Sequence, residues 1–217
     1  VISGYTYSFR VQAVTDAGLG DASTLMNATF DDSAPYLRII EPVDNSAYNS
    51  SDLTAIWDVK EEETGIRSTV IKVDDEASRV NGTSFPIHLK APGLHTIEVS
   101  VENGIGLSSM DSVNFIYDPE PPVLSFNDPD PAHTNLNQLT IGWTMLDRMT
   151  GISSVLYKLS GTGWQEMEKS YQLTIQFDRE GSHILDIMVI DDAGNINTSS
   201  KEVIVDWTRP GVVILSP

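Results

Sequence analysis

The sequence predicts an all-β protein composed of tandem antiparallel β-sandwiches. Three observations predict this class. Apolar and polar residues alternate over short stretches, segments rich in Gly, Asn and Asp interrupt them, and whole blocks of sequence recur. Alternation with a period of two is the pattern of a strand that buries one face. Many short strands separated by turns about every 8–12 residues favour sandwiches over other folds.

The repeat has a period of about 87 residues, the size of one small sandwich. LTAIWDVKEEETGI at residues 53–66 aligns with LTIGWTMLDRMTGI at residues 139–152. Three similar proline-containing segments end at Pro42, Pro129 and Pro217. We therefore expect two complete sandwiches, one at residues 33–118 and one at residues 119–207.

The two ends of the sequence match only parts of such a unit. Residues 1–32 are expected to form the last strands of a preceding domain. Residues 208–217 are expected to form the first strand of a further repeat. The sequence is therefore interpreted as a piece of a longer chain.

The second main strand of each unit carries a tryptophan on its apolar side. Trp57 alternates with Ala55 and Val59, and Trp143 alternates with Ile141 and Met145. The chain has no cysteine, so no disulfide can join the two sheets of a sandwich. We expect both tryptophans to be core anchors that take the place of that bond.

VIDDAGNINTSS at residues 189–200 has three interpretations: a metal loop, a pair of catalytic carboxylates or a hairpin tip. TDAGLG at residues 15–20 and VENGIG at residues 101–106 occupy the same place in their units. Asp or Asn followed by Gly is typical of tight hairpin turns. The sequence favours the hairpin, and adjacent acids on a strand would point to opposite faces.

These motifs resemble known families. GYTYSFRVQAVTDAGLG resembles the last hairpin of a fibronectin type III domain, which implies that Tyr7 packs at a corner and bonds to nearby backbone. The two complete units resemble the immunoglobulin-like (Big-type) repeats of bacterial and archaeal surface proteins. The resemblance rests on the tryptophan strand, Asp147 followed by Gly151 and Ile152, and the final Asp-Asp-Ala-Gly-Asn. It implies extracellular modules in tandem, with no shared activity.

Composition limits the partners. The net charge is −18, from 31 acidic and 13 basic residues, and such a surface repels nucleic acid and anionic membranes. The sequence has no apolar run of the roughly 18 residues that a membrane span requires. We expect neither a nucleic-acid partner nor membrane insertion of this segment.

The sequence also argues against an enzyme. It contains no G-x-S-x-G, no H-E-x-x-H, no P-loop and no G-x-G-x-x-G after a strand. His95 and His183 are equivalent by repeat and far apart in sequence, so we interpret them as structural corner residues bonded to nearby backbone. No catalytic residue and no organic cofactor are predicted.

Calcium remains an alternative, because acids gather near the unit junctions and could supply oxygen ligands. Acids of this kind near the junctions are Asp31, Asp32, Asp118, Glu120, Asp128, Asp130 and Asp206. The candidate calcium ligands are Asp118, Glu120, Asp191, Asp192 and Asp206. The competing interpretation is that these acids are solvated and keep strand edges from pairing between chains.

Two kinds of surface feature complete the predictions. Trp164 lies in a hairpin region and is the candidate for contact with a sugar or a protein. Candidate glycosylation positions begin N-x-Ser/Thr triplets at Asn27, Asn49, Asn81 and Asn197. The sequence thus favours a non-catalytic spacer or adhesion module of a large secreted or cell-surface prokaryotic protein, with neighbouring domains as its partners. The alternative is a carbohydrate- or protein-binding accessory region of an extracellular enzyme or adhesin.

Overall fold

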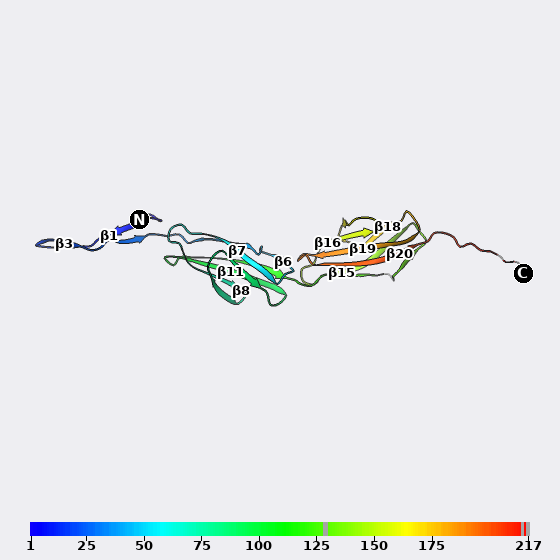
Figure 1. Cartoon of the computed structure of the whole chain (residues 1–217), viewed down its shortest axis with the longest axis horizontal. Coiled ribbons are helices and arrows are strands. Elements are labelled where there is room, and N and C mark those ends of the chain that lie inside the picture. Colours follow the sequence, from blue (N-terminus) through cyan, green and yellow to red (C-terminus); the bar gives the residue numbers. More distant parts are fainter. Residues whose placement is uncertain (128–129, 214, 216–217) are drawn as a thin grey trace. The chain divides into compact units, whose positions relative to one another are not determined.

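The structure is a computed structural model that describes residues 1–127, 130–213 and 215. Within these residues every regular element is a β-strand, and two β-sandwiches follow a short N-terminal region (Figure 1). The all-β prediction is confirmed. None of the described elements is a helix that could cross a membrane.

The N-terminal region forms two small antiparallel pairs. β1 (Thr6–Phe9) pairs with β4 (Met26–Thr29), and β2 (Gln12–Thr15) pairs with β3 (Gly18–Ala22). Nearly all of their residues are exposed. The buried cores therefore come from the two sandwiches.

The first sandwich packs a three-stranded sheet against a five-stranded sheet. The three-stranded sheet has the order β10 (Ser84–His88), β7 (Asp52–Lys60) and β5 (Tyr36–Glu41). The five-stranded sheet has the order β6 (Ser46–Tyr48), β12 (Ser108–Tyr117), β11 (Gly93–Asn103), β8 (Ile66–Val73) and β9 (Glu76–Val80).

The second sandwich repeats this order strand for strand. Its smaller sheet is β18 (Gln172–Gln176), β15 (Gln138–Leu146) and β13 (Val123–Phe126). Its larger sheet is β14 (Ala132–Thr134), β20 (Ile196–Val205), β19 (Gly181–Asp191), β16 (Ile152–Leu159) and β17 (Gln165–Met167). The repeat seen in the sequence is thus a repeat of topology.

The predicted strand at residues 208–217 lies partly outside the described residues. Its described part, residues 208–213 and 215, forms no strand. Asp128 also lies outside the described residues. The predicted domain boundaries remain predictions.

Each sandwich has one tryptophan at its centre. Trp57 on β7 and Trp143 on β15 are both 1% exposed. They occupy equivalent register positions, because Trp57 lies opposite Ile39 and Trp143 lies opposite Phe126. The Nε1 of each indole is buried without a hydrogen-bond partner, so both contribute through apolar burial and not through hydrogen bonding.

The core of the second sandwich is composed of side chains from both of its sheets. It includes Ile141, Trp143, Val155, Leu185 and Val203. All of these residues are between 0% and 1% exposed. The tryptophan and the aliphatic residues around it therefore form a core that lies within one repeat.

We predict that Trp57→Ala destabilises the first sandwich and leaves the second unchanged. Removing a buried indole leaves a cavity, and such changes cost about 3–5 kcal/mol. Calorimetry of the whole chain would show one of two unfolding transitions moving to lower temperature. Trp143→Ala is the matched control and should move the other transition. A single transition that shifts as a whole in both variants would contradict separate cores.

Candidate functional site

Three carboxylates converge at one end of the second sandwich. Asp118 follows β12, Asp147 follows β15, and Asp191 is the last residue of β19. Each offers a ligand oxygen, and these oxygens all lie within 4.8 Å of one another. Asp118 is fully buried and Asp191 is 1% exposed. Ionised carboxylates at such a separation repel one another where water is excluded.

Neutral donors hold the three carboxylates in place. Asp118 accepts hydrogen bonds from the Thr150 hydroxyl at 2.8 Å and from the Glu120 backbone N–H at 3.0 Å. Asp191 accepts two from Asn195, through its backbone N–H at 2.8 Å and its side-chain amide at 2.9 Å. The described part of the chain places no Lys or Arg in an ion pair with these acids.

Asp147 is held by the turn that it begins. Its Oδ1 accepts backbone hydrogen bonds from Thr150 at 2.7 Å, Gly151 at 2.8 Å and Met149 at 2.9 Å. Burial opposes ionisation of Asp147, but these donors outweigh it and hold the pKa of its carboxyl below the ordinary value. The cluster thus includes an acid that stays ionised, as a calcium ligand must be.

The equivalent end of the first sandwich has different chemistry. Asn103, the last residue of β11, stands where Asp191 stands in the second sandwich. Its Nδ2 donates a hydrogen bond of 2.7 Å to Asp31 Oδ2. The first sandwich thus has an amide donor at the position where the second has a carboxylate.

Asp31 completes this network. It accepts hydrogen bonds from the Thr64 hydroxyl at 2.6 Å and from Ser33 at 3.0 Å. The Thr64 hydroxyl contributes most, and with Ser33 it holds the pKa of Asp31 below its ordinary value although burial opposes it. At this end of the first sandwich, protein donors thus hold the Asp31 carboxylate in place.

The structure sorts the predicted calcium ligands. It brings Asp118 and Asp191 together, whereas Glu120, Asp192 and Asp206 are not part of the cluster. Asp192 is exposed, and Asp206 accepts a backbone hydrogen bond from Thr208. Asp147 was not among the predicted ligands. The signal that could have identified Asp147 was its place in the repeat motif, where it is followed by Gly151 and Ile152.

The segment at residues 189–200 is a hairpin, as the turn interpretation predicts. β19 and β20 pair through it, and Gly194 has φ of 87°, a conformation that favours glycine. One of the two adjacent acids, Asp191, nevertheless belongs to the carboxylate cluster. The hairpin prediction therefore holds for this segment, and the metal interpretation stays a prediction for Asp191.

The two equivalent histidines have different partners. His183 Nε2 lies 3.1 Å from the backbone carbonyl oxygen of Arg179. His95 Nδ1 instead lies 2.8 Å from Asp74 Oδ2, and its ring lies against Phe115 with centroids 5.7 Å apart. The first sandwich therefore holds a His–Asp pair where the second uses backbone.

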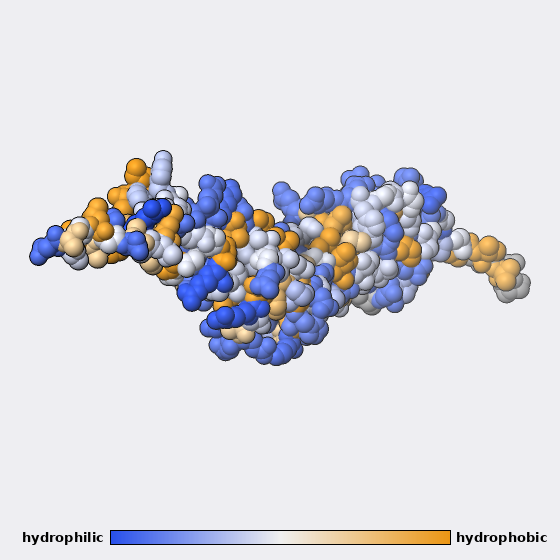
Figure 2. All heavy atoms as spheres, turned by 60° about the vertical axis from the view of Figure 1, so that its left-hand side comes forward, coloured by the Kyte–Doolittle hydropathy of each residue, from blue (hydrophilic) through white to orange (hydrophobic). Residues whose placement is uncertain are grey.

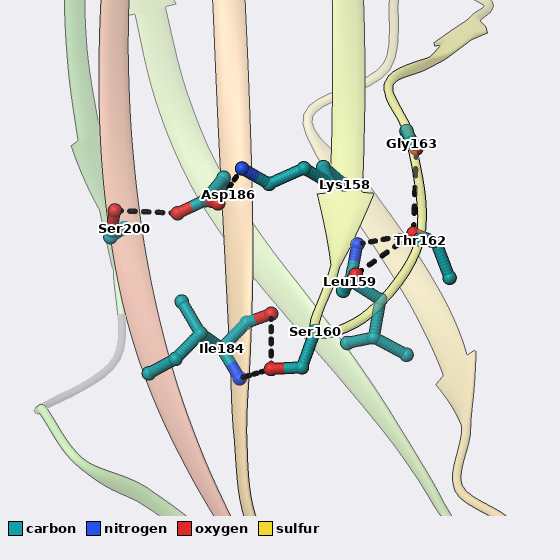
Figure 3. Close-up of polar contacts among 8 residues, drawn as sticks. All are labelled: Lys158, Leu159, Ser160, Thr162, Gly163, Ile184, Asp186 and Ser200. Atoms are coloured by element: carbon teal, nitrogen blue, oxygen red, sulfur yellow. Dashed lines mark hydrogen bonds and ion pairs between the residues drawn. The ribbon is translucent and has the colours of Figure 1, made fainter.

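Trp164 is 38% exposed beside a row of polar side chains. Lys158 Nζ lies 4.9 Å from the centroid of the indole ring and 2.9 Å from Asp186 Oδ2. Ser200 donates a hydrogen bond of 2.6 Å to Asp186. Figure 3 shows the row Lys158, Asp186 and Ser200 crossing from β16 over β19 to β20. This row fixes the cation that contacts the ring.

The remaining predicted residues are placed as follows. Tyr7 Oη accepts a hydrogen bond of 2.6 Å from the backbone N–H of Ile2. Asn27, Asn49 and Asn81 are exposed. Asn197 is partly buried, and its Nδ2 donates to the Pro122 carbonyl at 2.8 Å. A glycan on Asn197 would compete with that bond, whereas the other three positions are open to solvent.

Comparison with known proteins supports the fold. The fibronectin(III)-like modules of Clostridium thermocellum CbhA share 19% identity, with a TM-score of 0.52, over 78% of this chain and 94% of theirs. The chicken CNTN1 FN1–FN3 domains share 14% identity, with a TM-score of 0.47, over 94% of this chain and 77% of theirs. No protein-family model and no curated protein matches the chain. The chain thus has tandem sandwiches of the fibronectin type III and immunoglobulin-like kind.

We predict that Asp74→Asn makes the first sandwich less sensitive to acid. Burial opposes ionisation of Asp74, but the Thr96 backbone N–H and His95 outweigh it and hold its pKa below the ordinary value. A lowered pKa adds stability above the ordinary pKa of 3.8 and loses it as pH falls through the folded value. Asn tolerates the left-handed backbone of this position, where φ is 51°.

The measurement is the melting temperature of the first sandwich between pH 6 and pH 3. The decrease should be smaller in Asp74→Asn than in the unmodified chain. Asp75→Asn, an exposed neighbour in the same turn, is the control and should retain the original decrease. Parallel curves for all three proteins would show that Asp74 contributes nothing to acid sensitivity.

Proposed function

We propose that the chain is a non-catalytic spacer or adhesion region of a large secreted or cell-surface prokaryotic protein. The observation that carries this proposal is the repetition of one strand order around two tryptophan cores. A repeat with its own core can be added or removed without rebuilding its neighbours. The acidic surface opposes self-association of such arrays.

We predict two similar steps when the whole chain is stretched by force from its two ends. Each sandwich spans about 80 residues, so unfolding should release roughly 250 Å of chain once the folded length is subtracted. Single-molecule force spectroscopy would record both steps. Trp143→Ala should lower the force of one step and leave the other as a control. One step of about double length would contradict the modular spacer.

A second proposal is that calcium stabilises the second sandwich. Asp118, Asp147 and Asp191 offer the hard oxygen ligands that calcium prefers. The first sandwich supports this proposal by contrast, because there an amide of Asn103 replaces the carboxylate of Asp191. In this proposal a bound cation relieves the repulsion among the three acids.

We predict that calcium raises the melting temperature of the second sandwich and not that of the first. At a free concentration 100-fold above Kd, the gain is about 2.7 kcal/mol. Asp191→Asn should abolish the response, since it copies the first sandwich. Asp192→Asn changes an exposed neighbour and should leave it intact. Calorimetry with calcium against a chelator gives the test, and identical curves would refute the proposal.

The ligand-binding alternative rests on Trp164. An exposed indole next to a fixed Lys–Asp–Ser row offers a flat apolar surface with polar groups beside it, suited to a carbohydrate or a protein. A change in Trp164 fluorescence on addition of a soluble polysaccharide, absent in Trp164→Ala, would favour this role over a purely mechanical one.

A further inference from the structure

A groove runs along one side of the first sandwich, between β5 and the first half of β12. It has a volume of about 850 Å³ and is lined by residues of both strands, with Asp58 from β7 and Asp44 from the β5–β6 connection. Tyr36 and Ile40 on its rim are 49% and 50% exposed. Figure 2 shows apolar patches exposed on the visible face of the molecule.

The wall formed by β5 is the open edge of a sheet. In the described part of the chain, β7 is the single strand that pairs with β5. The Ile39 N–H points away from β7, because it donates a hydrogen bond of 2.7 Å to Asp111 Oδ2 on β12. Alternate residues of an antiparallel strand present their backbone groups to the same side. The backbone N–H and C=O of Leu37 therefore also face the groove.

The opposite wall is open over the same length. The short strand β6 runs along the second half of β12. There the backbone N–H of Asn45 donates to the Asn114 carbonyl, and the backbone N–H of Asp118 donates to the Tyr48 carbonyl. Asp111, Ser112 and Val113 of β12 therefore border the groove, on the side of β12 that does not pair with β11. The side chain of Asp111 bridges the two edges.

The second sandwich indicates what fits this place. Val113 is the sixth residue of β12, and Lys201 is the sixth residue of β20. Lys201 is 1% exposed, and its Nζ lies 5.7 Å from the ring of Phe126. Phe126 is the counterpart of Ile39, since both lie opposite the core tryptophan. Where the first sandwich has an open groove, the second holds a cationic side chain of its own.

The charges of the groove are complementary to a cation. Three carboxylates line it, those of Asp44, Asp58 and Asp111, together with the guanidinium of Arg38. Lys60 Nζ also lies 4.0 Å from Asp58 Oδ2, so Asp44 and Asp111 are the two acids of the groove without a cation beside them in the described part of the chain. An extended chain that pairs with β5 would place every second side chain toward these acids. The length of β5, six residues, gives an extended partner about 20 Å of edge to pair with.

We propose that this groove binds an extended segment of another protein that carries alternating lysine or arginine residues and adds a strand to β5. Its backbone pairs with Leu37 and Ile39, and the Ile39 N–H exchanges the Asp111 carboxylate for a backbone carbonyl. The released carboxylate of Asp111 then pairs with a cationic side chain of the segment. This binding function is additional to the proposed spacer role.

The test titrates the whole chain with the heptapeptide acetyl-Val-Lys-Val-Lys-Val-Lys-Val-amide and follows backbone amides by NMR. Saturable shifts are expected at residues 37–40 and 108–113. The same peptide with glutamate in place of lysine tests charge. A version with N-methylated valines keeps the charge and removes backbone donors. Neither of these two control peptides should bind measurably.

Three variants localise the site at side chains outside the core, and a fourth changes Val113, which is buried. Ile40→Lys puts a like charge on the exposed rim and should weaken binding about tenfold. Asp58→Asn should weaken it about threefold, as expected for one exposed ion pair. Asp75→Asn removes an acid outside the groove and should leave the affinity unchanged. Val113→Lys copies the second sandwich and should abolish binding in a chain whose other amide signals remain dispersed.

Four results would overturn the proposal. Equal affinity for the N-methylated peptide would show non-specific attraction to the acidic surface. Shifts confined to the second sandwich would place the site elsewhere, and absence of saturable shifts would show no site. Concentration-dependent shifts of residues 37–40 without peptide would identify a second copy of the chain as the occupant.

Discussion

Burial of one tryptophan between the two sheets of each sandwich is the constraint on which the other features depend. The chain has no cysteine, so no covalent bond closes the sandwich. An indole buries roughly 150–250 Å², which at about 25 cal/mol per Å² amounts to about 4–6 kcal/mol. Trp57 and Trp143 also fix the register of β7 and β15, because a slip of one residue would turn them to solvent.

The fixed register brings three polar positions to one end of each sandwich. One position follows the strand that carries the tryptophan. The second is the last residue of the first strand of the final hairpin, and the third precedes the first strand of the smaller sheet. In the first sandwich these positions include Asn103, whose amide donates to Asp31. In the second sandwich they are all carboxylates. An amide at one of these positions in the first sandwich, and a carboxylate in the second, thus separate a network with its own donor from a cluster of three carboxylates.

The sequence was sufficient for the fold because alternation and repetition are local signals. Trp57 and Trp143 alternate with aliphatic residues, and the strands lie where this pattern places them. The carboxylate cluster was only partly predictable. Asp118, Asp147 and Asp191 are separated by 29 and 44 positions in the sequence, and only the packing of three strand ends brings them together. Lys201 gave a weaker signal still, since a lysine at an inward position of β20 breaks the alternation, and the ring of Phe126 beside it is far away in the sequence.

The two sandwiches differ at a buried position beside the edge of the smaller sheet. Most positions between the sheets are apolar in both copies, because a polar side chain there needs a buried partner. The buried Val113 of β12 nevertheless corresponds to the buried Lys201 of β20. Val113 leaves the edge of β5 accessible and Asp111 covers one of its donors, whereas Lys201 fills the same space from within. A spacer requires the tryptophan cores alone, so a groove that is open in one copy and filled in the other is a feature that the mechanical role does not explain.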